Sequence, residues 1–559
     1  QLSEKSFMHN DSAVSSFRFV HDKIQQAAAE LMSEQERRAL HMRLGLAISS
    51  HIVDDDPGND EVFLAAVNQI NCGGPGALSD PSKRGKIASL NLKAGKRAIA
   101  FLDFNAALKL FEHGVSFLPN GSWATHYNLS VDLFDAAAEA ACITNNRSAL
   151  SLYSNPLIRN VKCFNDKLNC LYSVTKTLRQ ASLYQKSMES AFEIIQQCGE
   201  ELPLPMGNEK LNAEMQVMNL HLKNTPDESI LNMGETKSRK IVILLKTYAL
   251  LANMLMFTEP SLKGAVSLRM VDLTIKSGLT SVCPLAFAYY GGTLASMGND
   301  HMSEASRLGR IALKLSEKSE SSIYKSSVIC IVYFTISWAS CPLQAIAEAH
   351  LAGHQAGMQA GDFLFSVMNE LIFFQDNFLT GHSLTIVRRQ FRDFILKMQS
   401  KDIQPAVGRS NSILYHLHAA VLQDGEHLLN EEYVDGVPGL GHVFDKIDTT
   451  VSLLIKNLCV QRAFLFRRFD DVSFGSNNIL DLISEEKHQL RPVLLMGIFF
   501  EGLVSFQLAR RTSDETKTKW IGKGVSALAK MQCWTNHCEW NFENKMLLLK
   551  AEKMYTLGQ

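Results

Sequence analysis

Cysteine and histidine gather near the carboxyl end of the chain, in the segment MQCWTNHCEW. Cys533, His537 and Cys538 are residue types that bind zinc through thiolate and imidazole groups. A structural zinc site needs about four ligands, and the segment offers no evident fourth. Trp534 and Trp540 flank the cluster, so we favour a packed core over a metal site.

An acidic turn, DDDPGND, resembles the start of a calcium-binding loop. Asp54, Asp56 and Asp60 offer oxygen ligands, but Gly58 stands at the fifth position, where another oxygen is needed. Ala65 stands at the twelfth position, where calcium loops place a bidentate Glu. We therefore interpret this segment as a solvated acidic turn, and we expect no metal ligand in the chain.

His21 and Asp22 are the residue types of a proton-transfer pair. Adjacent residues of a helix point in different directions, so the two side chains do not readily pair. A structural interpretation is favoured, in which Asp22 stabilises a helix N-terminus and His21 bonds across an interface.

Signatures of nucleotide chemistry do not occur in the sequence. The phosphate-binding pattern GxxxxGK[ST] is missing, and GKGVSALAK (Gly522 to Lys530) has the wrong spacing, so we interpret it as a solvated helix start. A kinase catalytic loop and a DFG motif are also missing. The sequence therefore predicts no catalytic and no cofactor-binding residue, and no enzyme activity in this chain.

The charge balance argues against a general attraction to polyanions. The 559 residues include 56 Lys and Arg against 57 Asp and Glu, a net charge of -1. Arg467 and Arg468 lie among aromatic residues, but Asp470 and Asp471 offset their charge. The 11 scattered Cys suit reduced thiols. We expect a cytoplasmic protein that binds neither nucleic acid nor membrane.

One uncharged segment, Ser327 to Ala347, is long enough to imitate a membrane span. Polar residues interrupt it, and Pro342 stands where a second helix would begin. We predict two buried helices joined at Ser340–Pro342.

Helical periodicity dominates the chain, which has only 14 Pro and 33 Gly. A helix is expected in FRFVHDKIQQAAAELM, with a two-stranded wing upstream of Phe17 or within SSFRFV. Ser33 and Glu36 form a capping-box pattern at the start of the next helix. The apolar face expected for that helix contains Leu40, Leu44, Ala47, Ile48 and His51.

A tetratricopeptide-like helix pair is predicted in AGKRAIAFLDFNAALKLFEHGVSFLP. Gly95, Ala107 and Gly114 allow two antiparallel helices to approach, Phe111 fills the space beside them, and Pro119 ends the pair. Weaker repeats follow, with small residues at 305, 309 and 312 and at 345, 349 and 353. The predicted fold is all-α, a TPR-like α-solenoid with a small winged-helix-like remnant at the N-terminus.

The segment FRFVHDKIQQAAAELMSEQERRALHMRLG resembles a known family. It is similar to the region that follows the AAA/STAND-type ATPase module of very large signalling proteins. These proteins often carry a serine/threonine kinase-like domain before that module and GAF or histidine-kinase domains after it. The matching residues are Phe17, Phe19, His21, Asp22, Gln25, Gln26, Ala27, Ala28, Arg38, Leu40 and His41. Ala29 departs from the family, which usually has an aromatic residue there.

Weaker similarities follow in the family's order: VNQIN, NLKAGKRAIA, ISWASCPLQAI, QAGD, VDGVPGL and NFENKMLLLKAEK. The resemblance implies a domain order. Residues 1–52 are the distal end of an ATPase-associated winged-helix-like unit, 53–205 the first TPR-like repeats, 206–238 an irregular connector with a short helix, 239–400 the middle repeats and 401–559 the C-terminal repeats. ATP is expected only in a module upstream of this chain, as are any ATPase and kinase activities.

The leading hypothesis is a non-catalytic arm that couples a nucleotide switch to signalling domains, or that binds a protein partner. Its partners would be other proteins or other domains of the same polypeptide. The structural and interface candidates are His21, Asp22, Gln25, Gln26, Gly95, Ala107, Phe111, Gly114 and Pro119. Two alternatives stay open, a passive interaction scaffold and an all-α enzyme with a cleft inside the superhelix.

Overall fold

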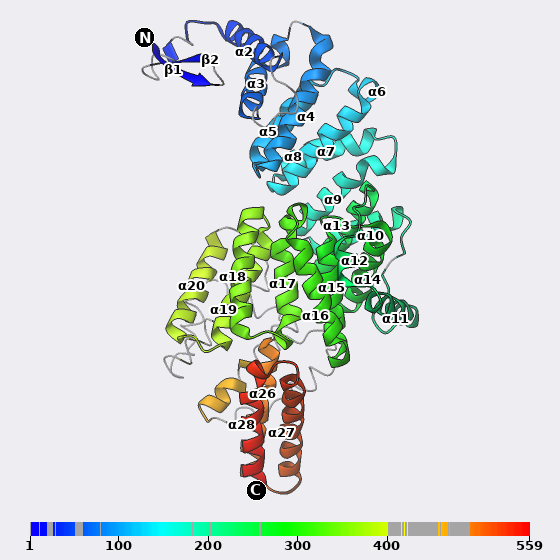
Figure 1. Cartoon of the computed structure of the whole chain (residues 1–559), viewed down its shortest axis with the longest axis vertical. Coiled ribbons are helices and arrows are strands. Elements are labelled where there is room, and N and C mark those ends of the chain that lie inside the picture. Colours follow the sequence, from blue (N-terminus) through cyan, green and yellow to red (C-terminus); the bar gives the residue numbers. More distant parts are fainter. Residues whose placement is uncertain are drawn as a thin grey trace. The chain divides into compact units, whose positions relative to one another are not determined.

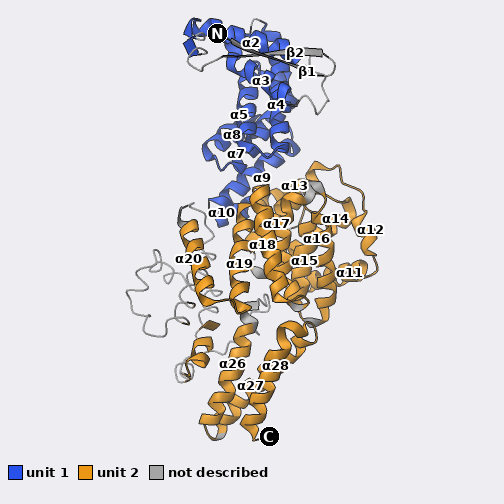
Figure 2. Ribbon diagram, turned by 60° about the vertical axis from the view of Figure 1, so that its left-hand side comes forward, with its two compact units in different colours: residues 1–190 blue, residues 191–559 orange. Residues whose placement is uncertain are grey.

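The protein is described here by a computed structural model. It describes residues 2–9, 12–19, 26–27, 30–50, 60–78, 80–181, 183–201, 203–255, 259–400, 415, 419, 422, 457–458, 460–467, 469 and 492–558. Apart from one hairpin, the elements named in these residues are helices (Figure 1). The chain divides into two compact units, residues 1–190 and 191–559 (Figure 2).

Unit 1 begins with the hairpin and continues with consecutive helices, the last of which crosses the division at residue 190. The elements are β1 (Leu2–His9), β2 (Ser12–Phe19), α2 (Glu34–Ser50), α3 (Asp60–Gly73), η2 (Pro75–Ala77), η3 (Pro81–Lys83), α4 (Arg84–Ala100), α5 (Phe104–Phe117), α6 (Ser122–Thr125), α7 (Tyr127–Ile143), α8 (Arg147–Asn160), α9 (Phe164–Gln180) and α10 (Tyr184–Gln197).

Unit 2 is helical in all the elements described. They are α11 (Glu209–Lys223), α12 (Asp227–Leu231), α13 (Arg239–Leu255), α14 (Pro260–Ser277), α15 (Cys283–Met297), η4 (Asn299–His301), α16 (Met302–Ser316), η5 (Ser319–Tyr324), α17 (Lys325–Thr335), η6 (Ser337–Ala339), α18 (Leu343–Ala360), α19 (Phe363–Leu379), α20 (Leu384–Ser400), α26 (Pro492–Arg511), α27 (Asp514–Thr535) and α28 (Glu539–Leu557). The expected connector 206–238 thus contains α11 and α12.

Successive helices pack in pairs within each unit. In unit 1, α4 contacts α5 and α7 contacts α8; in unit 2, α15 contacts α16 and α18 contacts α19. Short turns join the members of each pair, which makes them antiparallel neighbours. The predicted class, an all-α, TPR-like α-solenoid, is confirmed.

The hairpin at the N-terminus is the strand pair that the sequence placed near Phe17. Its strands run antiparallel, with Leu2 opposite Phe19 and His9 opposite Ser12. The wing was expected upstream of Phe17 or within SSFRFV, and β2 covers part of both.

The capping box before α2 is confirmed. The Ser33 backbone N–H donates to the Glu36 carboxylate at 2.9 Å, and the Glu36 N–H donates to the Ser33 hydroxyl at 3.3 Å. These bonds satisfy donors that the first turn of a helix otherwise leaves unpaired.

The predicted packing face of α2 is wrong. Leu40 and Leu44 are exposed, whereas Met42 and Gly45 are buried against α3. A Cβ at Gly45 would lie 2.7 Å from the Ala66 carbonyl oxygen. The closest approach of the two helices is therefore set by a glycine and not by the larger apolar side chains.

The crossing of α4 and α5 is built from the residues singled out in the sequence. Ala107 and Phe111 are fully buried. The Phe111 ring occupies the space where a Cβ of Gly95 would be, and a Cβ at Gly114 would lie 2.6 Å from Leu133 of α7. Pro119 follows the end of α5.

Two buried asparagines join α3 to α4. The side-chain amide of Asn71 donates to Asn91 at 2.8 Å, and that of Asn91 donates back at 3.0 Å. Each buried amide thereby gains both a donor and an acceptor, which offsets the cost of removing it from water. This pair fixes the register between the two helices.

Leu102, in the turn between α4 and α5, has φ 60, a left-handed conformation that L residues adopt at a cost. We predict that Leu102→Gly raises the free energy of unfolding by about 0.5–1 kcal/mol, since glycine removes the Cβ strain but enlarges the unfolded ensemble. Urea unfolding measures the change. Leu102→Ala, which keeps the Cβ, should give no gain; an equal gain from alanine would contradict this explanation.

The uncharged segment Ser327 to Ala347 is divided between two α-helices, and the second begins after Pro342 as predicted. The first ends earlier than expected: α17 stops at Thr335, and the short 3-10 helix η6 separates it from α18. Among the residues that the structure describes, no helix combines the length and the apolarity that a membrane span requires.

The small residues predicted on α18 agree with the structure only in part. Ala345 is exposed, whereas Gly353 is buried, as is Gly357, which was not predicted. A Cβ at Gly353 would lie 2.8 Å from Asn369 of α19, and one at Gly357 would lie 2.6 Å from the Ser326 hydroxyl of α17. The closest approach of α17 and α19 is therefore in the C-terminal half of α18.

His350 is a fully buried histidine on α18. Its Nδ1–H donates to the Asn369 side-chain oxygen at 2.7 Å, and Nε2 has no hydrogen-bond partner among the described residues. Burial lowers the pKa of His350 to about 4, against a partial opposing effect of the bond to Asn369. The ring is therefore neutral in the folded protein.

Acid should destabilise the protein through His350. The His350 ring binds a proton near pH 6.5 in the unfolded chain and only near pH 4 in the folded chain. Its contribution to the free energy of unfolding is therefore fully present above pH 6.5 and is lost as the pH falls towards 4. The expected loss is about 3 kcal/mol. Urea unfolding at pH 7 and pH 4.5 measures it, and His350→Gln should flatten the difference. An unchanged pH dependence in that variant would contradict the assignment.

The N-terminus of α28 is tied to the turn before α18. The side-chain amide of Asn541 donates to the Trp338 carbonyl at 3.1 Å and to the Cys341 carbonyl at 2.8 Å. Its oxygen accepts from the Leu343 N–H at 3.0 Å. Beside these bonds, the Trp338 ring lies edge-on to Trp534, with ring centroids 6.2 Å apart.

Candidate functional site

The structure describes only part of the predicted N-terminal interface. His21, Asp22 and Gln25 lie outside the described residues, as do Asp54 and Asp56 of the acidic turn. Gln26 is exposed, and its side-chain amide donates to Glu30 at 2.9 Å. The interface role of these residues stays a prediction.

The other candidates form packing contacts within unit 1. Gly95, Ala107, Phe111 and Gly114 are buried inside the α4–α5–α7 cluster, and Pro119 is partly buried at its edge. Their side chains position helices and do not present polar groups to a ligand.

The cysteine–histidine segment belongs to a packed junction. Trp534 contacts Trp338 and Phe542, and Cys538 is the buried N-cap residue of α28. Burial raises the pKa of the Cys538 thiol, which disfavours the thiolate that zinc binds. In the described part of the chain, no three His, Cys, Asp or Glu side chains are placed to hold a metal ion.

The glycine-rich segment Gly522 to Lys530 lies in the middle of α27, so the predicted helix start is wrong. A Cβ at Gly524 would contact the Phe506 ring of α26 at 2.6 Å, whereas Gly522 faces open space. Gly524 therefore permits helix packing, which is a structural role.

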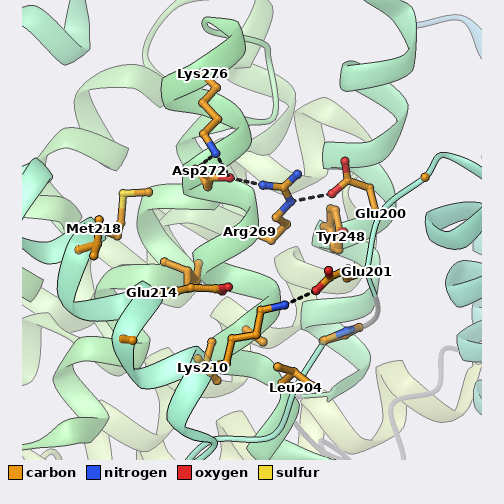
Figure 3. Close-up of a pocket in the computed structure, with 17 residues that line it drawn as sticks. Glu200, Glu201, Leu204, Lys210, Glu214, Met218, Tyr248, Arg269, Asp272 and Lys276 are labelled. Carbon is orange, nitrogen blue, oxygen red and sulfur yellow. Dashed lines mark hydrogen bonds and ion pairs between the residues drawn. The ribbon is translucent and has the colours of Figure 1, made fainter.

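A pocket of about 700 Å³ opens in unit 2 (Figure 3). Its walls are the segment that follows α10, the helix α11, and one face of α13 and α14. The side chains that line it combine aliphatic and charged groups: Glu200, Glu201, Pro203, Leu204, Lys210, Leu211, Ala213, Glu214, Val217, Met218, Tyr248, Ala265, Leu268, Arg269, Asp272 and Lys276, with the backbone of Gly199.

The α10–α11 loop, which forms one wall of the pocket, contacts α14. The Met206 N–H donates to the Ser261 carbonyl at 2.7 Å. The Met206 side chain lies on Gly264, in the space that a Cβ there would need. Asn208 then caps α11 by accepting from the Lys210 N–H at 3.0 Å.

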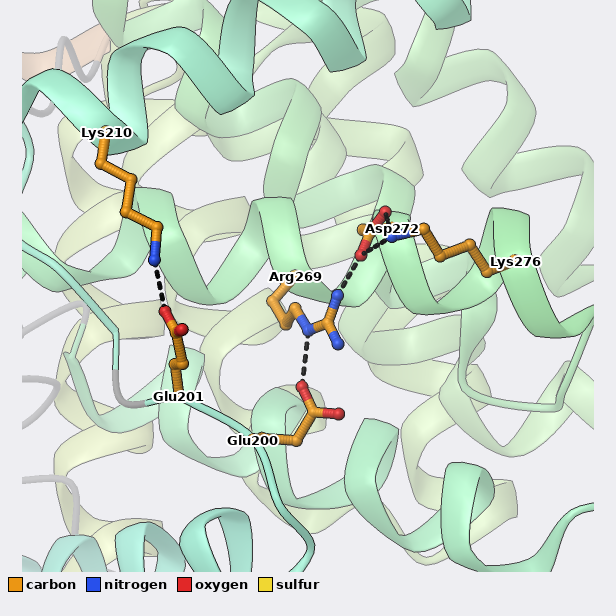
Figure 4. Close-up of polar contacts among 6 residues, drawn as sticks. All are labelled: Glu200, Glu201, Lys210, Arg269, Asp272 and Lys276. Carbon is orange, nitrogen blue, oxygen red and sulfur yellow. Dashed lines mark hydrogen bonds and ion pairs between the residues drawn. The ribbon is translucent and has the colours of Figure 1, made fainter.

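A chain of ion pairs joins four of the residues that line the pocket: Glu200, Arg269, Asp272 and Lys276 (Figure 4). Arg269 Nε donates to Glu200 at 2.6 Å, and its Nη1 donates to Asp272. Lys276 Nζ lies 2.8 Å from the same Asp272 carboxylate. Burial opposes the charge of Arg269, but the bonds to Glu200 and Asp272 outweigh it and raise the pKa of the guanidinium. These charges are therefore mutually satisfied.

Tyr248 lines the pocket beside Arg269 (Figure 3). Burial raises the pKa of its hydroxyl, and the negative charge of Glu200 adds to the effect. Among the described residues, no acceptor receives its proton. The buried hydroxyl of Tyr248 is therefore neutral and unsuited to act as a base.

The mouth of the pocket holds a second, more exposed ion pair. Lys210 Nζ lies 2.5 Å from Glu201, and their side chains are 54% and 82% exposed. The hydrogen bond to Glu201 is the main cause that raises the pKa of Lys210, and Glu214 adds to it. This pair is solvated and can open at little cost.

The arrangement offers a ligand both charged and aliphatic side chains. Glu200, Arg269, Asp272 and Lys276 are held in ion pairs, and the remaining lining is largely aliphatic. The sequence predicted none of these residues as a site. Only the spacing of Arg269, Asp272 and Lys276 on one helix was a visible signal, whereas Glu200 joins them from 69 residues away.

Comparison with curated proteins finds a distant similarity. No family model matches the chain. Hybrid signal transduction histidine kinase G of Dictyostelium discoideum is 20% identical over 367 residues, which cover 58% of this chain and 10% of the relative. The chain thus spans about a tenth of the length of that protein.

Among solved structures, this chain is similar to a circular tandem repeat protein with novel repeat topology, at 10% sequence identity. The match covers 95% of this chain and 91% of that protein. The TM-score is 0.13. A score this low carries no argument, so the fold assignment rests on the helix pairs themselves.

Proposed function

We propose that this chain is a non-catalytic helical-repeat arm of a large signal-transduction protein. It couples a nucleotide switch in an ATPase module to signalling domains, and its surfaces bind protein partners. The observation that supports this proposal is the similarity to a hybrid histidine kinase across a chain made of stacked helix pairs.

Stacked helix pairs suit such a role for a physical reason. Each pair contacts mainly its neighbours, so a change at one end alters a series of similar interfaces. Nucleotide biases the position of the arm only if the ATPase module binds differently to the arm in its ATP and ADP states. The proposal therefore requires a nucleotide-dependent contact on this chain.

Limited proteolysis of the full-length protein tests the coupling. A non-hydrolysable ATP analogue and ADP should give different cleavage rates within residues 1–559, because the arm is docked in one state and released in the other. A variant of the full-length protein that does not bind nucleotide should show one rate in both conditions. Equal rates in the unaltered protein would favour the passive scaffold.

A further inference from the structure

The outer face of α11 carries an apolar stripe at the pocket. Ala213, Val217 and Leu220 are separated by four and three residues and so share one helix face. Val217 is 70% exposed and Leu220 is 63% exposed. Ala213 and Val217 also line the pocket, opposite Leu204. Because the other face of α11 supplies its contacts with the protein, this stripe is accessible to an apolar ligand.

The lining of the pocket has an excess of negative charge. Four carboxylates line the pocket, against three cationic side chains. Arg269 and Lys276 are bound to carboxylates, as described above. At the mouth, Lys210 alone faces two carboxylates, Glu201 at 2.5 Å and Glu214 one helical turn away on α11. A second positive charge would balance these two carboxylates.

We infer that the pocket binds a cationic amphipathic segment of a protein partner, an inference that rests on the interaction role proposed above. Aliphatic side chains of the segment cover Val217 and Leu204. A Lys or Arg of the segment displaces Lys210 and lies between Glu201 and Glu214. Lys210 is then an internal competitor that occupies the cation position when no partner is bound.

The dimensions and exposure of the site agree with this arrangement. A volume of about 700 Å³ is within the range of ligand pockets and accommodates a few side chains. The rest of the segment lies along α11, on Leu220. Displacing Lys210 costs little, since its side chain is half exposed and its charge stays in water.

The direction in which one substitution changes the affinity for a peptide tests the inference. The probe is a fluorescein-labelled amphipathic peptide of leucine and lysine, titrated with the chain of residues 1–559 and followed by anisotropy. Lys210→Ala removes the competitor and should tighten binding by about two- to fivefold, the effect of one exposed ion pair. If the site bound an anionic ligand, the same substitution would weaken binding of an acidic probe.

Two further variants test whether the peptide binds at the pocket. Glu214→Gln should weaken binding of the leucine–lysine peptide by about two- to fivefold, and Val217→Asn should weaken it by about tenfold. Glu543→Gln and Lys550→Ala, on the exposed surface of α28, repeat the two charge changes elsewhere and should leave binding unchanged.

Several results would overturn the inference. They are the lack of binding by the unaltered chain, unchanged or weaker binding by Lys210→Ala, and equal binding of a leucine–glutamate peptide. An effect of the α28 variants as large as that of Glu214→Gln would also do so, since it would mean non-specific attraction. The titration involves no nucleotide, so its failure is separate from a failure of the proposed coupling, which proteolysis measures.

Discussion

Replacing Phe111 with alanine should lower the free energy of unfolding of unit 1 by about 3–5 kcal/mol. The ring is fully buried and fills the α4–α5 crossing against Gly95, so its removal leaves a cavity that the helices do not easily close. Urea unfolding followed by circular dichroism measures the loss. Hydrogen exchange of the α4 and α5 amides then shows whether the loss is local to this crossing.

A double-mutant cycle gives this prediction its control. Gly95→Ala should cost about 1–3 kcal/mol, because the new Cβ enters the space of the ring. In a Phe111→Leu background the same substitution should cost less, since part of the ring is gone. Gly76→Ala, which meets open space, should cost little in either background. Additive effects at Gly95 and Phe111 would contradict the packing described here.

Replacing Arg307 with methionine should cost unit 2 about 3 kcal/mol. The Arg307 side chain, 17% exposed, joins α16 to the end of α11 and the start of α12. It donates to the Leu222 carbonyl at 2.9 Å and to the Thr225 carbonyl at 2.5 Å, and Nε donates to Asp227 at 2.6 Å. Methionine keeps the aliphatic stem but leaves these acceptors without their charged donor.

The matched variant is Arg307→Lys. Lysine keeps the charge but not the planar fork that reaches several acceptors at once, so it should recover only part of the loss. Urea unfolding gives the magnitude, and hydrogen exchange should place the largest change in α11 and α12. A full recovery with lysine would mean that charge alone, and not the geometry of the guanidinium, holds these helices.

Local features of the fold were predictable because they depend on residues close together in the chain. The capping box of Ser33 and Glu36, the break at Pro342 and the Gly95–Phe111 crossing all act within one turn or one helix pair. Periodicity also indicated helices nearly everywhere, which fixed the all-α class.

The packing faces were less predictable. The apolar pattern of α2 favoured Leu40 and Leu44, yet Gly45 and Met42 contact α3. An amphipathic pattern says that a helix has an apolar face, but a glycine can allow so close an approach that another face becomes the core. In α18 the predicted small-residue stripe holds at Gly353 but not at Ala345, which is exposed.

By itself, the sequence determined the helical solenoid and the lack of phosphate-binding and kinase motifs, since both are properties of short stretches. Only the tertiary structure decided the pocket. It brings Glu200 to Arg269 across 69 residues and Asp227 to Arg307 across 80. No local pattern encodes such pairs, because a surface charge finds its partner only after the helices between them have packed.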